Sequence, residues 1–286
     1  MDIGMKWFAV LFLLIPRGSA HGQEVPYFVT YSHHMEEPGS LEVEVKTASG
    51  APTAGNRFFG NSIEFEYGAT AWWTSEVYLD FTATKDDSTV PGGFRIENRV
   101  RPLMSEHWIN PVLYFEFEDI NAANKSVLEV VGHDVATDFS GPVALARAEK
   151  KREVELKLIL SSDFKGWNLS ENLIFEKNLD NSPWEFGYAL ATSRPLRLRA
   201  SPRPCTVCAE KFTAGAEMYG GLGTRYTPGL HDTSHYAGPV LGWQLPHDTR
   251  LSVEEGFGLS SASLDHIVRF GLAYEFGQLS RLQRKH

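Results

Sequence analysis

The sequence predicts an all-β protein, a closed antiparallel up-and-down transmembrane β-barrel of about 12 strands, within a range of about 10–14. First, a series of segments alternates apolar and polar residues, as strands with one oily and one wet face do. Second, clusters of Gly, Pro, Asp and Asn separate these segments. Third, the segments follow a stretch with the features of an export signal. Because a closed barrel pairs all its backbone groups, alternating strands can separate lipid from a polar interior.

Twelve alternating segments can be placed along the chain, and an even number is typical of single-chain bacterial barrels. Asp86-Asp87-Ser88 and Pro91-Gly92-Gly93 predict a loop before the fourth, and 127–132 predicts a short accessory strand. The last segment is the clearest, since Val268, Phe270 and Leu272 alternate with Arg269 and Gly271. The predicted strands are 40–48, 59–69, 73–84, 93–101, 110–119, 152–162, 166–177, 183–193, 211–224, 233–244, 249–260 and 266–276.

Two connections between these strands are long, 120–151 and 194–210. If the mature chain starts in the periplasm, 120–151 lies outside the cell, as the long loops of such barrels do. On the same count 194–210 lies in the periplasm, where turns are usually short. It is either an exception or the sign of a further strand.

The start of the chain predicts a secretory signal peptide over 1–22, removed on export. Lys6 precedes the nine apolar residues 7–15, and Pro16 and several small residues follow. Nine apolar residues are too few for a spanning helix, which needs about 20. We therefore expect the barrel to occupy 23–276, with a C-terminal extension over 277–286.

Composition agrees with this fold and excludes two classes of protein. The 25 Gly, 18 Phe, 10 Tyr and 7 Trp favour strands, tight turns and aromatic residues at membrane interfaces. A formal net charge of −9 argues against a nucleic-acid partner, which would require a basic face. Two cysteines cannot build a disulfide-dense secreted scaffold.

The signal at 1–22, the alternating segments and a last strand ending in Phe276 resemble Gram-negative outer-membrane β-barrels. The stretches 185–188, 220–223 and 268–271 also resemble transporter-like barrels named after phenol-degradation clusters. The resemblance implies a place in the outer membrane, with outer-membrane lipid and, during assembly, the barrel-insertion machinery as partners. In that class a closing strand that ends in Phe resembles the insertion signal, although here ten residues follow Phe276.

Charged residues are frequent on the faces predicted to line the lumen. One interpretation is a net-acidic channel that favours cations or neutral polar solutes. The other is a plugged interior in which carboxylates and arginines pair only to hold the barrel together. The predicted lumen-lining residues are Glu64, Glu66, Glu76, Asp80, Arg95, Glu97, Arg99, Glu116, Glu118, Glu153, Glu155, Glu185, Glu217, Arg269 and Glu275.

Cys205 and Cys208 form a CxxC motif, which has three interpretations: a local disulfide, half of a metal site or a redox pair. With no second CxxC, and in an oxidising compartment, the disulfide is the preferred interpretation. His231 and His235, in His-Asp-x-x-His, and the pair His33 and His34 are candidate metal ligands. Since spacing supplies no further ligands, we assign no metal site and no cofactor.

The sequence contains no G-x-S-x-G motif, and serine–histidine neighbours on one strand point to opposite faces, so no enzymatic activity is expected. No amino-terminal plug domain is evident, which argues against an energised receptor. The favoured function is a passive channel or transporter for small polar or hydrophobic solutes through the charged lumen. The alternatives are a non-conducting structural or surface-binding barrel that uses 120–151, and a secreted soluble β-sandwich that binds a ligand.

Overall fold

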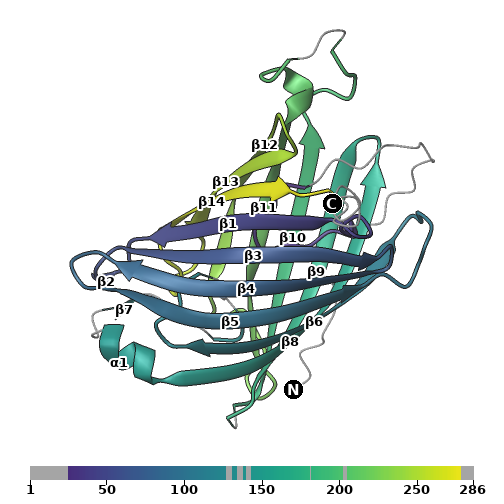
Figure 1. The fold of residues 1–286 in the computed structure, drawn as a ribbon. Helices are drawn as coiled ribbons and strands as arrows, with labels where there is room; N and C mark the ends of the chain where they lie inside the picture. The colour runs from purple at the N-terminus through teal and green to yellow at the C-terminus, as the bar shows by residue number, and fades with distance from the viewer. Residues whose placement is uncertain are drawn as a thin grey trace, which may run out of the picture.

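The structure, a computed structural model, describes residues 25–126, 131–133, 138–139, 143–180, 182–201 and 205–277. Twelve antiparallel strands form one closed barrel in chain order, with β1 pairing to both β3 and β14 (Figure 1). The predicted closed twelve-stranded barrel is confirmed, and the two-sheet sandwich is excluded. The strands are β1 (Leu41–Gly50), β3 (Phe58–Thr70), β4 (Trp73–Thr84), β5 (Thr89–Val100), β6 (Asn110–Asn121), β8 (Lys150–Phe164), β9 (Trp167–Asn178), β10 (Trp184–Pro195), β11 (Phe212–Thr224), β12 (His235–Leu245), β13 (Thr249–Gly258) and β14 (His266–Glu275).

Alternation along the strands places apolar side chains outside and most polar ones inside, where a few apolar residues such as Val112, Ile159 and Ile267 are also buried. On β14, Val268 and Phe270 are 46% and 42% exposed, whereas Arg269 between them is 3% exposed. Side chains of successive strand residues point to opposite faces, so this sequence pattern fixes which face meets lipid. In the part of the chain described here, no helix is long and apolar enough to span a membrane.

The loop predicted before the fourth strand is shorter than expected. β5 already begins at Thr89, and the register against β4 shifts between Asp80 and Phe81, which pair with Gly93 and Pro91. Gly92 is thus the extra residue of a β-bulge. Gly93 has φ +139°, and a Cβ there would lie 2.3 Å from the carbonyl oxygen of Asp119. The Pro-Gly-Gly sequence therefore serves a bulge inside a strand, not a loop.

The connections lie at two ends of the barrel. The termini end carries the start of β1, the end of β14 and the connections 71–72, 101–109, 165–166, 196–211 and 246–248. Lys165 and Gly166, with φ +49° and +81°, make the tight β8–β9 turn, as a two-residue hairpin requires. The connection 196–211 is long, and its described residues hold only the short helix η1 (Ala209–Lys211), with no further strand.

The opposite end, called the loop end, carries the connections 51–57, 85–88, 122–149, 179–183, 225–234 and 259–265. Three short elements gather there, β2 (Ala54–Gly55), β7 (Asp138–Phe139) and α1 (Val143–Ala148), on the left in Figure 1. Residues 127–130 of the predicted accessory strand lie outside the described residues, as do the predicted signal peptide and all but Gly277 of the C-terminal extension.

Candidate functional site

The predicted lumen-lining residues all lie on inward faces of the strands. Most are buried, and Glu66, Glu185 and Glu275 are half-buried. Among the buried charged residues of the described strands, carboxylates outnumber cationic groups. The lumen wall is therefore polar and acidic. The buried ones are Glu64, Glu76, Asp80, Arg95, Glu97, Arg99, Glu116, Glu118, Glu153, Glu155, Glu217 and Arg269.

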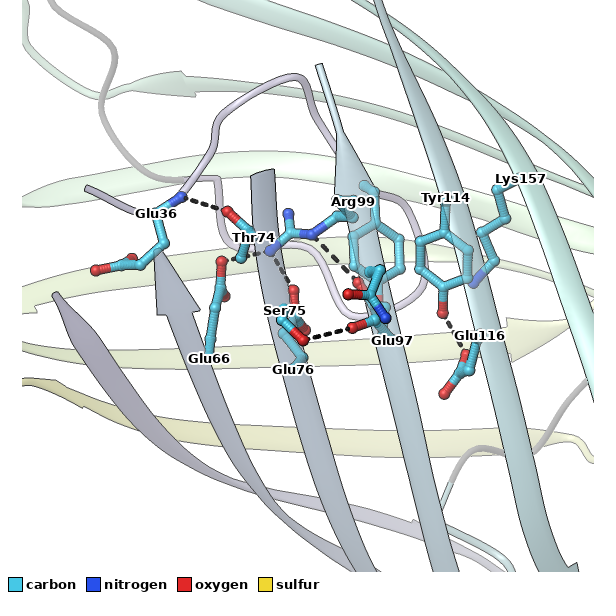
Figure 2. Close-up of polar contacts among 12 residues, drawn as sticks. Glu36, Glu66, Thr74, Ser75, Glu76, Glu97, Arg99, Tyr114, Glu116 and Lys157 are labelled. Atoms are coloured by element: carbon cyan, nitrogen blue, oxygen red, sulfur yellow. Dashed lines mark hydrogen bonds and ion pairs between the residues drawn. The ribbon is translucent and has the colours of Figure 1, made fainter. Parts of the chain in front are cut away.

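Arg99 on β5 forms the centre of one cluster of lumen charges. Its guanidinium contacts the carboxylates of Glu66 and Glu76, and its Nε lies 3.2 Å from Oε1 of Glu97. The hydroxyl of Tyr78 donates to Glu97 at 2.9 Å. Figure 2 shows these carboxylates in a row across neighbouring strands, with Arg99 between them. One cation thus faces three carboxylates.

A second cluster continues the row toward β6 and β8. Arg95 donates from Nε to Asp80 and from an Nη to Glu116, both at 2.9 Å. Lys157 lies 2.8 Å from Glu155, beside the ring of Tyr114 (Figure 2). Since each buried cation has carboxylate partners, these groups stabilise the wall as well as charging it.

Two further ion pairs lie on the other side of the Arg99 cluster, on β1, β3, β13 and β14. Lys46 on β1 lies 2.5 Å from Glu64 on β3, and Arg269 on β14 lies 2.8 Å from Glu254 on β13. The charged groups therefore follow the inner wall over much of its circumference.

Residues 25–40, here called the inner segment, run inside the barrel before β1. Backbone amides of Phe28 and Val29 donate to the carboxylate of Glu217, both at 2.9 Å. The amide of Tyr31 donates to the side chain of Asn172 at 2.7 Å, and Asn172 donates back to the Tyr31 carbonyl at 2.9 Å. The segment is thus held by hydrogen bonds to side chains on β11 and β9, and its last two residues extend the β1–β3 pairing, where the Gly39 amide donates to the Gly68 carbonyl at 2.7 Å.

The inner segment could not be predicted from the sequence. It has no alternation, and its partners lie far away in the chain, Asn172 being 141 residues beyond Tyr31. The only available signal was its content of aromatic and histidine residues immediately after the expected cleavage point.

The connection after β6 also folds inward, from the loop end. Asn124 donates to Asp80 at 3.1 Å, and the amide of Lys125 donates to Thr82 at 3.0 Å. A Cβ at Gly60 would lie 2.1 Å from the Lys125 carbonyl oxygen, so the wall needs glycine there. The lumen is therefore narrowed from both ends.

Among the described residues, cavities lie between these inserts and the wall, and two of them adjoin the row of charges. The cavity on the termini side is about 120 Å³ and includes Glu66, Glu76 and Arg99 in its lining. The one toward the loop end is about 80 Å³, and Tyr31 and Lys46 line both. Spaces of this size hold a few water molecules each. Tyr31 of the inner segment therefore lies between the two cavities.

Solved structures with a similar fold are outer-membrane proteins. The COG4313 outer membrane channel from Pseudomonas putida F1 matches with a TM-score of 0.57 at 10% identity, over 89% of this chain and 100% of that chain. The KdgM porin matches with a TM-score of 0.50 at 6% identity, over 82% of this chain and 98% of that chain. The chain has the fold of outer-membrane channels and porins. No family model and no curated protein matches it. The likeness to phenol-degradation-cluster barrels stays a prediction.

The remaining candidate residues lie outside this row of charges. Cys205 and Cys208 are bonded to each other in the 196–211 connection, with their Cα atoms 5.6 Å apart. His231 is exposed and pairs with Asp232 at 2.6 Å, whereas His235 is buried and contacts Thr233 at 2.8 Å. The two histidines of His-Asp-x-x-His therefore lie in different environments.

His33 and His34 belong to the inner segment and lie near the termini end. Burial, then the neighbouring His34, lower the pKa of His33 to about 4, so its imidazole is neutral at pH 7. Glu36 has a raised pKa of about 7, because it is buried and lies near Glu275. The inner segment thus carries fewer charges at neutral pH than its sequence suggests.

Proposed function

We propose that the protein is an outer-membrane channel for small solutes, inserted with its termini end in the periplasm. The closed barrel with an apolar exterior and a charged lumen supports this, as does the fold shared with a channel and a porin. This orientation places the long 122–149 connection outside the cell, as is usual for such barrels. The expected absence of enzymatic activity stays a prediction.

The lumen chemistry favours cations and neutral polar solutes over anions. Acidic side chains on the wall attract cations and repel anions, the more strongly because water is scarce in a narrow pore. Passage would be diffusion without energy coupling. The observation that carries the proposal is the acidic lumen, continuous around the wall from β1 through β8.

Conduction requires the inner segment to shift. Residues 25–36 are held by hydrogen bonds to side chains of the wall, so their displacement leaves the strand pairing of the barrel intact. Each hydrogen bond contributes only about 0.5–1.5 kcal/mol net, or about 1.5–3 kcal/mol where a charged group takes part. Opening breaks several of these bonds together, so removing the segment is the direct way to measure what the lumen conducts without it.

The test is planar-bilayer recording from the purified barrel, with folding checked by heat-modifiable gel mobility. We expect single-channel steps and, in a KCl gradient, a reversal potential that reports preference for K⁺ over Cl⁻. Deletion of 25–36 should raise the conductance. A folded barrel that passes no current, with and without 25–36, would overturn the channel.

A second candidate is a non-conducting barrel that has a structural or surface-binding role. The inserts that enter the lumen from both ends favour it. The same recordings decide between the two, because a structural barrel stays silent after the deletion.

A further inference from the structure

Four metal-ligating side chains meet at the termini end, where the inner segment passes the barrel wall. His33 and His34 come from the inner segment, Asp163 from the end of β8 and Glu106 from the connection 101–109. Nε2 of His33 lies 3.0 Å from Glu106 Oε2 and 3.9 Å from Asp163 Oδ2, and Nε2 of His34 lies 2.9 Å from the same Asp163 oxygen. One ligand atom from each of His33, His34 and Asp163 lies within 4.8 Å of the others, and Glu106, exposed and in contact with His33, can turn toward them as a fourth ligand.

These separations fit a small tetrahedral ion. Zinc bonds of about 2.0–2.1 Å to nitrogen and oxygen place neighbouring donor atoms about 3.3 Å apart. The distances of 2.9, 3.0 and 3.9 Å bracket this value. To admit an ion, the 3.9 Å contact must therefore shorten and Glu106 must turn inward.

The non-ligating atoms of the same side chains are held by neighbours. Nδ1 of His33 lies 2.8 Å from Ser161 Oγ, Asp163 Oδ1 accepts from Asn168 at 2.7 Å, and Glu106 Oε1 accepts from Arg101 at 2.6 Å. Outer contacts of this kind orient ligands in metal sites and fix which histidine nitrogen is free. These outer hydrogen bonds are an observation independent of the donor distances, because contacts between the ligand side chains alone do not require them.

We propose that His33, His34, Asp163 and Glu106 bind one divalent transition-metal ion, with Zn²⁺ the best match. A His₂-carboxylate₂ set suits Zn²⁺ or Cu²⁺, whereas Ca²⁺ and Mg²⁺ prefer sites built from oxygen alone. His33 is fully buried and Glu106 is 62% exposed, so the site has a closed inner side and an open outer side. An ion can enter from the open side.

The bound ion would join three separate parts of the chain. It links the inner segment to β8 and to the 101–109 connection, and so fastens the segment that narrows the lumen. A ligand that binds only this arrangement stabilises it by mass action. Zn²⁺ would then favour the closed lumen, a consequence that rests on the proposed channel function.

Metal binding is tested by calorimetric titration of Zn²⁺ into tag-free, chelator-treated full-length barrel in detergent. We expect one Zn²⁺ per chain, with Ca²⁺ giving no heat at the same concentrations. His34→Gln and Glu106→Gln, both at partly exposed positions, should weaken binding more than about 100-fold, and Ser161→Ala about 10–100-fold. His107→Gln is the matched control, since His107 lies in the same connection as Glu106 and contacts Ser105 instead.

The proposal fails if Zn²⁺ gives no heat, if Ca²⁺ binds as tightly, or if the His34 and Glu106 variants keep the parent affinity while folded. The contacts would then be hydrogen bonds only. Bilayer recordings form a separate arm, in which Zn²⁺ should lower the open probability of the parent but not of His34→Gln. A silent barrel that still binds Zn²⁺ would overturn the channel and leave the metal site standing.

Discussion

Glu217 on β11 accepts a hydrogen bond from the backbone amide of Val29, with 2.9 Å between nitrogen and Oε1. The same carboxylate also accepts from the amides of Phe28 at 2.9 Å and Thr30 at 2.5 Å. Three consecutive amides inside the lumen thus depend on one side chain. A buried backbone amide that has no hydrogen-bond acceptor destabilises the folded state. The Glu217 carboxylate therefore decides whether the inner segment stays bound.

Replacing Glu217 with alanine should release the inner segment. Loss of a hydrogen bond to a charged group costs about 1.5–3 kcal/mol, and each 1.4 kcal/mol shifts an equilibrium about tenfold. We expect protease cleavage within 25–40 to become at least about tenfold faster while the strands stay resistant. Mass spectrometry of the fragments gives the rate. Glu255→Ala, at an exposed position on β13, is the control, and equal rates in the two variants would contradict the assignment.

Arg99 should contribute much more to stability than an exposed arginine. Arg99→Gln leaves the carboxylates of Glu66, Glu76 and Glu97 without their shared cation. Removal of one partner from a buried ion pair typically costs about 3–5 kcal/mol. Arg152→Gln breaks only the pair with Asp180, at 3.5 Å, in which both side chains are more than half exposed. That change should cost less than about 1 kcal/mol.

The two arginine variants are compared by urea unfolding of the barrel in lipid vesicles. A loss of stability that is similar for both would show that the Arg99 cluster is hydrated like a surface pair. The difference between the two variants in lost unfolding free energy therefore also measures how far water is excluded from the lumen around Arg99.

The fold could be predicted because its determinants are local. The alternation of Val268, Arg269 and Phe270 predicts which face of β14 meets lipid, and a period of two recurs along most of the strands. Turn-forming residues predicted the structure less well, because Pro91 and Gly93 are typical of a loop but lie in a β-bulge within β5. A local signal cannot distinguish the two, because both need the same residues.

The site could be predicted only in part. The alternation of polar and apolar residues predicts which side chains face the lumen, Glu97 and Glu217 among them. Their partners were not predicted, because Tyr31 meets Glu97 only through a segment without periodicity, over a separation of 66 residues. His33 and His34 were noted as a pair, but Asp163 lies 129 residues beyond His34, and no spacing rule joins them.

The outer face predicts a depth-dependent response to charge. Leu156 lies near the middle of β8 and Leu169 near the start of β9, and both point outward, 38% and 62% exposed. Arginine on a lipid-facing site costs about 2–4 kcal/mol at the midplane and about 0–1 kcal/mol near the interface. Leu156→Arg should therefore lower the unfolding free energy in vesicles, and the yield of folded barrel, more than Leu169→Arg. Equal losses would place the membrane at a different height on the barrel.

The disulfide should be dispensable for the barrel. Cys205 and Cys208 are three positions apart, and closing so short a loop stabilises the folded state by no more than about 2 kcal/mol. The loop is also held independently, because the indole of Trp243 on β12 donates to the Thr206 carbonyl at 2.9 Å. We expect the double variant Cys205→Ser/Cys208→Ser to keep heat-modifiable mobility and to lose at most that free energy of unfolding in urea. A double variant that fails to assemble, or that loses much more than that free energy, would contradict this expectation.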